Sequence, residues 1–300
     1  MPITAFLTDS TLCIGCKACE VACKEWNGVP DDGFAFTGFS YDNTAGLGHS
    51  SWRHVKFIER GEVPAENASG ACGPSASGGG PPPPGLRRAA PKLREGEAPR
   101  ALMNAGYRSN AFRWDFSSDV CKHCENAGCL EACPTGSIVR TEFGGVFIQP
   151  DVCNGCGYCI VSCPFGVVDR RPGDGRAFKC TFCYDRQKAG LRPACATACP
   201  TESIQFGEIG QLRERAARRV EVLRARGMDD VGVYDPRDSS VGGTHAIFIF
   251  RGEPEEYNLP ARPEVPTVHL KSGWQSAAVA AGLMLAGAAA AFFTRRSTSD

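Results

Sequence analysis

Cysteine spacing constrains this chain more than any other feature of its sequence. Each corner of a cubic iron–sulfur cluster needs one thiolate, and cysteines at i, i+3 and i+6 can reach three neighbouring corners. Sixteen of the 17 cysteines fall into four motifs of four: Cys13-Cys16-Cys19-Cys23, Cys121-Cys124-Cys129-Cys133, Cys153-Cys156-Cys159-Cys163 and Cys180-Cys183-Cys195-Cys199. The pattern predicts four [4Fe–4S] clusters and therefore a protein that transfers electrons.

Zinc sites and disulfide bonds are the main alternatives for so many thiols. Structural zinc usually takes two pairs of ligands, whereas the first and third motifs present three closely spaced thiols and then a fourth. Disulfide frameworks are typical of short secreted chains, and this chain has 300 residues and an odd cysteine count. A zinc-binding structural adaptor stays open as an alternative that iron quantitation would test.

The fourth ligand of each cluster is expected to come from another motif. In bacterial two-cluster ferredoxins the last cysteine of a motif, commonly followed by proline, binds the neighbouring cluster. Cys133, Cys163 and Cys199 precede prolines, which disfavour helical backbone at the cysteine, whereas Cys23 precedes Lys24. The exchange predicts site 1 (Cys13, Cys16, Cys19, Cys199), site 2 (Cys23, Cys180, Cys183, Cys195), site 3 (Cys121, Cys124, Cys129, Cys163) and site 4 (Cys133, Cys153, Cys156, Cys159).

The order of the motifs predicts two ferredoxin-like units, one inserted into the other. The second and third motifs are joined by a short segment with the apolar run 146–148, and together they resemble one two-cluster ferredoxin. The sequence Cys-Pro-Thr-x-Ser-Ile occurs at both 133–138 and 199–204, so the first and fourth motifs predict a second unit. We therefore expect an α+β fold with two interlocked units, the outer one at 1–60 and 169–210 and the inner one at 106–168.

Residues 61–105 interrupt the outer unit and differ in composition. Eight of the chain's 21 prolines lie between residues 61 and 100, four of them directly after three glycines. Such a segment buries too little apolar area to offset the entropy of ordering it, so we predict a disordered insertion. Cys72 lies inside it without a neighbouring thiol and is expected to be a bystander.

Secondary structure outside the motifs can be predicted at four places. Apolar and polar side chains partly alternate over residues 52–59, which indicates a strand, and residues 245–250 indicate another strand. Residues 211–226 predict an amphipathic helix within the segment 211–272, followed after the second strand by a proline-punctuated extended stretch. The helix would place four side chains on one face: Leu212, Ala216, Val220 and Leu223.

Residues 273–294 predict a transmembrane helix. Seventeen residues from Ala277 to Phe293 carry no charge, and with the four residues before them they would form a helix about 30 Å long. Small residues at Ala278, Gly282, Ala286 and Ala290 would let another membrane helix approach. A buried helix of a soluble domain is the alternative. The flanking basic residues weakly favour a cytoplasmic C-terminus.

Few other residues suggest chemistry. The sequence has no phosphate loop, dinucleotide fingerprint or nucleophile–base arrangement, so no catalytic residue is expected. His123 lies between two ligand cysteines and could tune a potential or simply pack, and Lys17, Lys122 and Lys179 could offset cluster charge. A formal net charge of zero provides no general attraction to nucleic acid, which is not expected as a partner.

The motifs together resemble the four-cluster electron-transfer subunits of molybdopterin oxidoreductases. Within that group, three stretches are similar to the iron–sulfur (beta) subunit of membrane-bound formate dehydrogenase: Cys13 to Asn27, Lys179 to Gly207, and Tyr234-Asp235-Pro236 with Val241 to His245. The C-terminal span is similar too, whereas residues 61–100 are longer and richer in proline than is usual in the family.

The resemblance implies a non-catalytic subunit of formate dehydrogenase. It implies that a molybdopterin (Mo or W) catalytic alpha subunit oxidises formate, that this chain relays the electrons, and that a membrane cytochrome b gamma subunit passes them to quinone. It also implies a single-pass protein of the cytoplasmic (inner) membrane with its main domain on the periplasmic or outer face. No secretory signal is evident at the N-terminus, and the family's catalytic subunit carries a twin-arginine export signal.

Two further expectations concern the electron path. The same relay role for another molybdopterin enzyme, such as a sulfur-compound or sulfoxide reductase, is the alternative to formate dehydrogenase. As a hypothesis, electrons enter at site 1 near the catalytic subunit, pass through the inner unit, and leave near the membrane at site 2 or its neighbour.

Overall fold

The computed structural model describes residues 2–31, 33, 42, 44, 46–60 and 113–297. The predicted insertion at 61–105 and Cys72 lie outside these described residues. The chain divides into two compact units, residues 1–57 with 116–300 and residues 58–115. Strands β2 (Arg53–Arg60) and β3 (Arg113–Val120) form a two-stranded sheet, and each strand has residues in both units. The description below concerns the first unit.

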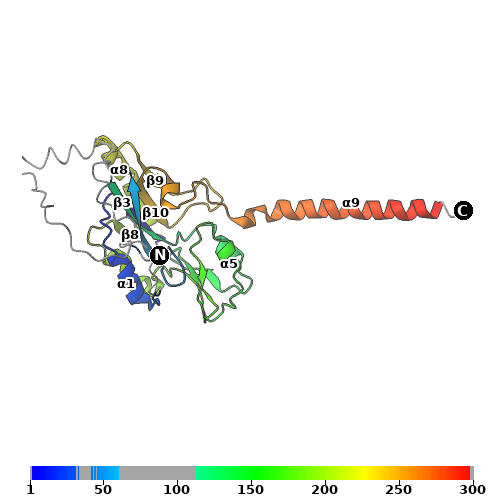
Figure 1. Ribbon diagram of the computed structural model, residues 1–300, viewed down its shortest axis with the longest axis horizontal. Coiled ribbons are helices and arrows are strands. Elements are labelled where there is room, and N and C mark those ends of the chain that lie inside the picture. Colours follow the sequence, from blue (N-terminus) through cyan, green and yellow to red (C-terminus); the bar gives the residue numbers. More distant parts are fainter. Residues whose placement is uncertain are drawn as a thin grey trace, which may run out of the picture. The chain divides into compact units, whose positions relative to one another are not determined.

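The first unit contains a four-stranded sheet with the strand order β8-β1-β10-β9 (Figure 1). Strand β1 pairs antiparallel with β8 and parallel with β10, so that Phe6 lies opposite both Phe206 and Ala246. Strand β10 also pairs antiparallel with β9. The strands are β1 (Thr4–Asp9), β8 (Ile204–Glu208), β9 (Val231–Tyr234) and β10 (Ala246–Arg251), which confirms the strand predicted at 245–250.

Helix α8 (Ile209–Ala225) packs on this sheet. The Glu208 carboxylate accepts hydrogen bonds from the backbone N–H groups of Gly210 (2.8 Å) and Gln211 (2.9 Å), which caps the helix N-terminus. The helix and its predicted apolar face are confirmed, although it begins two residues earlier than expected. The shared core contains Leu212, Ala216, Val220 and Leu223 from the helix with Ala5, Leu7, Ile247 and Ile249 from the sheet.

Short helices and strands lie within and after the cysteine motifs. The helix that starts at Gly128 packs closely against Ser162, since a Cβ at Gly128 would lie only 2.5 Å from the Ser162 carbonyl oxygen. The short helices are α1 (Ala18–Asn27), α4 (Gly128–Glu131), α5 (Tyr158–Val161), α6 (Tyr184–Lys188) and α7 (Ala194–Thr197). The strand pairs are β4 (Ile138–Arg140) with β5 (Val146–Ile148) and β6 (Asp169–Arg170) with β7 (Ala177–Phe178).

The repeat seen in the sequence is also a repeat in structure. Each Cys-Pro-Thr segment leads directly into a strand that begins with a buried isoleucine, Ile138 in β4 and Ile204 in β8. Strand β4 pairs with β5, and β8 pairs with β1, in both cases antiparallel. The end of the second motif and the end of the fourth are therefore held by equivalent strand pairs.

The chain ends in a long apolar helix, α9 (Leu270–Ser297), after two single-turn helices, η1 (Pro254–Tyr257) and η2 (Pro266–His269). Among the described residues, Pro266–Ala291 is the one helical stretch long and apolar enough to cross a membrane, judged by length and composition. Its large apolar side chains are exposed, including Trp274, Leu283 and Met284. A helix packed in a soluble core would bury such side chains, so this exposure disfavours the soluble alternative.

Candidate metal centres

The four motifs share one backbone feature between their first two cysteines. The residue before the second cysteine has a positive φ in every motif: Gly15 (+69°), His123 (+44°), Gly155 (+74°) and Phe182 (+61°). A left-handed residue folds the loop back on itself, which lets both thiols face one space. Glycine adopts this conformation readily, whereas for histidine and phenylalanine it costs about 1–3 kcal/mol.

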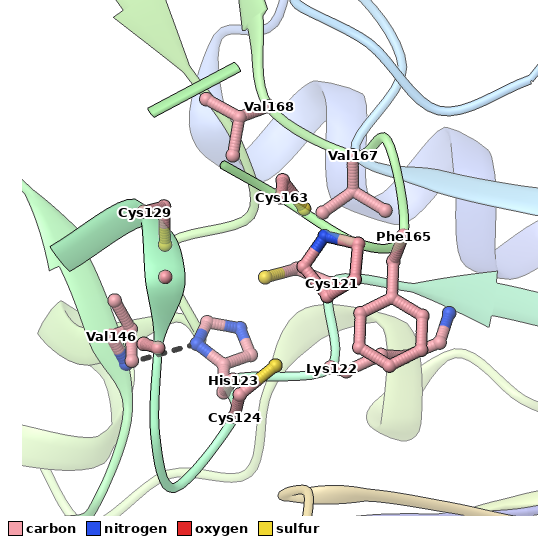
Figure 2. A pocket seen from close by; sticks show the side chains of 13 residues that line it. Cys121, Lys122, His123, Cys124, Cys129, Val146, Cys163, Phe165, Val167 and Val168 are labelled. Atoms are coloured by element: carbon pink, nitrogen blue, oxygen red, sulfur yellow. Dashed lines mark hydrogen bonds between the residues drawn. The ribbon is translucent and has the colours of Figure 1, made fainter. Parts of the chain in front are cut away.

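Site 3 lines a pocket with about 320 Å³ of empty space (Figure 2). Three of its thiols come from the second motif, and the fourth, Cys163, comes from the end of the third motif. The remaining wall is largely apolar and includes Val146, Phe165, Val167 and Val168. The arrangement provides four soft sulfur donors in a water-poor space, which suits an iron–sulfur cluster.

Site 1 lines a second pocket, with about 290 Å³ of empty space. Here Cys199, from the fourth motif, joins three thiols of the first motif. Pro200 and Thr201 line the same pocket, so the turn after Cys199 forms part of its wall. Both pockets thus combine the first three cysteines of one motif with the last cysteine of another.

The thiols predicted for sites 2 and 4 lie near one another, because the charges of the other thiols in each set act on the pKa of Cys23 and of Cys159. Burial raises the pKa of Cys23 well above its ordinary value, and its neighbours in site 2 raise it further. Burial raises the pKa of Cys159 to about 11, and the other thiols of site 4 contribute. The neighbours are Cys180, Cys195 and Cys183 for Cys23, and Cys153, Cys156 and Cys133 for Cys159.

The thiol sets of sites 1 and 3 can be compared with what a single zinc ion requires. A Zn–S bond of about 2.3 Å would hold all four sulfur atoms within about 4 Å of one another. Across the described part of the chain, no three histidine, cysteine, aspartate or glutamate side chains gather tightly enough to hold one metal ion. Sites 1 and 3 each bring four thiols from two motifs to one pocket, which is the ligand number that a [4Fe–4S] cluster requires.

Burial disfavours the thiolate form that metal binding requires. It raises the pKa of Cys19 and of Cys129 to about 12, although a nearby cation opposes the rise in each case. Cys133 differs. Burial alone would raise its pKa, but nearby hydroxyls and backbone N–H groups, with Ser137 Oγ at 3.1 Å from the sulfur, lower it to about 7.

Arg53, in strand β2, lies between sites 1 and 2. Its guanidinium is buried and donates hydrogen bonds to Cys195 Sγ (3.2 Å) and to the Ser118 carbonyl (3.2 Å). Burial alone would lower the arginine pKa, but the negative charges of Cys195 in site 2 and Cys19 in site 1 raise it. Sequence reasoning missed this residue because it lies outside every cysteine motif.

Lys179 holds the equivalent place between sites 2 and 3. Its buried ammonium donates to the carbonyl oxygens of Val146 (2.5 Å) and Cys180 (3.1 Å). Burial alone would lower its pKa, but thiolates of site 3 and of site 2, Cys121, Cys129 and Cys180, raise it. Lys179 therefore offsets thiolate charge in the way the sequence suggested.

The other two lysines that the sequence singled out form ion pairs with carboxylates. Lys122 is buried and its ammonium donates to the Asp119 carboxylate. Lys17 Nζ lies 2.8 Å from Asp42 Oδ1. Their charge is thus largely balanced within the protein.

His123 is a buried residue of the site 3 wall and not a surface residue. The Val146 N–H donates to its Nδ1 at 3.0 Å, the dashed line in Figure 2. Its ring packs against Phe182, with 4.4 Å between the ring centroids. Burial, and next the charge of Lys179, lower the pKa of His123 well below its ordinary value.

Comparison with known proteins gives consistent matches. Two family profiles, both described as a 4Fe-4S dicluster domain, match residues 112–209 and 12–137. The nitrate-inducible formate dehydrogenase iron-sulfur subunit of Escherichia coli (strain K12) is 36% identical over 285 residues, which cover 93% of this chain and 80% of that protein. The formate dehydrogenase iron-sulfur subunit of Haemophilus influenzae is 35% identical over 265 residues, 87% of this chain and 70% of that protein.

A relative from another enzyme is matched over less of the chain. The thiosulfate reductase electron transfer subunit PhsB of Salmonella typhi is 33% identical over 220 residues, which cover 73% of this chain and 83% of that protein.

Proposed function

This chain belongs to the family of formate dehydrogenase iron–sulfur subunits, and from that membership we propose its cluster ligands, partners and membrane attachment. It is an electron-transfer subunit of a formate dehydrogenase complex, and it holds four [4Fe–4S] clusters. The clusters supply one-electron carriers, and the protein supplies their ligands and the charges around them.

We assign one cluster to each of sites 1 to 4. The assignment is supported by the exchange of last cysteines, since Cys163 and Cys199 each line a pocket with three thiols of another motif. It makes residues 1–60 with 169–210 an outer ferredoxin-like unit and residues 106–168 an inner unit interlocked with it. Residues 61–105 would be an insertion, 211–272 a supporting segment and 273–294 the membrane helix.

The clusters would form a relay in the order 1, 2, 3, 4. In three pairs of thiols from neighbouring sites, the charge of one raises the pKa of the other: Cys195 raises that of Cys19, Cys121 that of Cys180, and Cys159 that of Cys129. These pairs join site 1 to site 2, site 2 to site 3, and site 3 to site 4. This order differs from the path expected from the sequence, because site 2 lies between site 1 and the inner unit.

The donor and acceptor are proposed from the family. A molybdopterin (Mo or W) catalytic alpha subunit would deliver electrons from formate, and a membrane cytochrome b gamma subunit would receive them. The exposed apolar surface of α9 supports contact with the bilayer and with a partner helix. We place the main domain on the periplasmic or outer face of the cytoplasmic membrane, with α9 as a single span.

Formate should reduce the clusters of the purified complex under anaerobic conditions. The physical reason is that these clusters would accept the electrons that the catalytic subunit releases when it oxidises formate. EPR spectra recorded before and after formate addition measure the reduction, with dithionite as the control that all four clusters are reducible. Clusters that formate leaves oxidised, but that thiosulfate or a sulfoxide reoxidises after dithionite, would instead assign the chain to a sulfur-compound or sulfoxide reductase.

Replacing Leu283 with arginine should weaken membrane attachment. A charge at the centre of a spanning helix costs about 2.5–3.5 kcal/mol, so the L283R chain should shift from the membrane fraction to the supernatant after an alkaline wash. The matched control is Leu270→Arg at the start of α9, where an arginine can reach water. Equal retention of the two variants would contradict a spanning helix.

A further inference from the structure

His123 occupies a backbone position that two of the other motifs give to glycine. Gly15 and Gly155 precede the second cysteine of the first and third motifs, and His123 takes the same left-handed conformation with φ +44°. A side chain other than glycine here carries about 1–3 kcal/mol of strain, which proteins tend to keep where the side chain has a task. The imidazole is therefore a candidate for a role beyond packing.

A hydrogen bond fixes which nitrogen of the imidazole carries the proton. The Val146 N–H donates to His123 Nδ1 at 3.0 Å, and a nitrogen that accepts this bond has no proton of its own. Since an imidazole side chain carries at least one ring proton, that proton lies on Nε2. The Lys179 ammonium donates to the Val146 carbonyl at 2.5 Å, so the residue whose N–H orients the ring is itself held on its carbonyl side.

The Nε2 atom of His123 is buried and has no hydrogen-bond partner among the residues that the structure describes. The side chain is 1% exposed and forms part of the wall of the site 3 pocket. Figure 2 shows the ring among the sulfur atoms of site 3, with its second nitrogen turned away from Val146. A buried N–H group without an acceptor costs about 1–3 kcal/mol, so an acceptor in the pocket is expected.

We propose that the Nε2–H group of His123 donates a hydrogen bond to a sulfur atom of the cluster held at site 3, and thereby raises the reduction potential of that cluster. The inference rests on the proposed assignment of a cluster to this site. Reduction adds negative charge to the cluster, so a donor to its sulfur atoms favours the reduced form.

The other three motifs have no side-chain N–H donor at the residue before their second cysteine. Gly15 and Gly155 have no side chain, and the side chain of Phe182 has no N–H or O–H group, although its backbone N–H donates to Cys180 Sγ at 3.4 Å. The effect should therefore be confined to the site 3 cluster. His123 acts in this proposal as a residue that tunes a potential, not as a ligand.

Two substitutions separate the donor from the structural role of the side chain. Asparagine tolerates the left-handed backbone, and its amide oxygen can take the place of Nδ1 as acceptor for Val146, but it has no atom where Nε2 lies. Glutamine is long enough to place an amide N–H group near the position of Nε2. His123→Asn should therefore remove the donor, and His123→Gln should restore it.

The test is an EPR-monitored redox titration of the whole purified complex with each variant. The site 3 component is identified as the one missing from Cys124→Ala. H123N should make its reduction equilibrium about fivefold to tenfold less favourable, a fall of about 40–60 mV for a one-electron couple, while H123Q should stay near the wild-type value. The other three components should titrate unchanged in both variants.

Two results would overturn the inference. One is an H123N midpoint that equals the wild-type midpoint, and the other is an H123Q midpoint that falls as far as that of H123N. Failure of the cluster assignment itself would look different. In that case Cys124→Ala would keep all four EPR components, whatever the histidine variants do.

Discussion

Replacing Cys163 with alanine should remove the same EPR component as replacing Cys124, although the two cysteines belong to different motifs. Cys163 lines the site 3 pocket with three thiols of the second motif. Its loss leaves one iron corner without a thiolate, so the site 3 cluster should be lost or reduced to a three-iron form. Iron quantitation should show a loss of about one to four atoms per chain.

The control for this prediction is Cys156→Ala, which removes a site 4 ligand from the same motif as Cys163. It should abolish a different component, with its own midpoint potential. If each cluster took all its ligands from one motif, Cys163→Ala would instead match Cys156→Ala and spare the component lost in Cys124→Ala. That outcome would refute the interlocked arrangement of the two units.

Replacing Arg53 with methionine should lower the potential of the site 2 cluster strongly. The guanidinium bonds Cys195 Sγ at 3.2 Å, and reduction of the cluster adds negative charge beside it. At an effective dielectric constant of about 20, a unit charge roughly 7 Å away is worth about 2 kcal/mol, or a fall of about 0.1 V. Site 1 should shift in the same direction, because the charge of Cys19 also acts on Arg53.

Arg53→Lys is the matched control, since it keeps the charge but not the planar fork. Its potentials should lie between those of the wild type and Arg53→Met in a redox titration of the purified complex. Thermal unfolding of each variant separates a general loss of stability from a change confined to two clusters. Equal potentials in wild type and Arg53→Met would show that the buried charge does not act on the clusters.

The sets of thiols that lie together could be predicted from the sequence, because the last cysteine of a motif can be recognised from its immediate neighbours in the sequence. Proline after Cys133, Cys163 and Cys199 marks the last cysteine of a motif, and the structure brings the thiols of each predicted set together. The face of α8 could also be predicted, since a helix that packs on a sheet repeats its apolar residues every three or four positions. Which thiols bind which cluster stays a prediction.

Other features could not be predicted because tertiary contacts produce them. Arg53 lies on a strand with no cysteine, and only the folded chain brings its guanidinium to Cys195. The neighbourhood of Cys180 and Cys121, which sets the proposed order of the relay, joins residues that are 59 positions apart in the sequence. The role of His123 was left open by the sequence, since the Val146 contact that orients its ring comes from strand β5.

The two buried cations also tie the maturation of this protein to its iron supply. Arg53 and Lys179 keep their positive charges in the interior because thiolates face them. Before iron is inserted, burial favours protonated thiols at Cys19 and Cys129, and the cations would then be buried without counter-charges, at a cost of several kcal/mol. A chain that has not received its iron would therefore stay open around these residues and be accessible to proteases. On this argument, closure of the interior around Arg53 and Lys179 would depend on iron insertion.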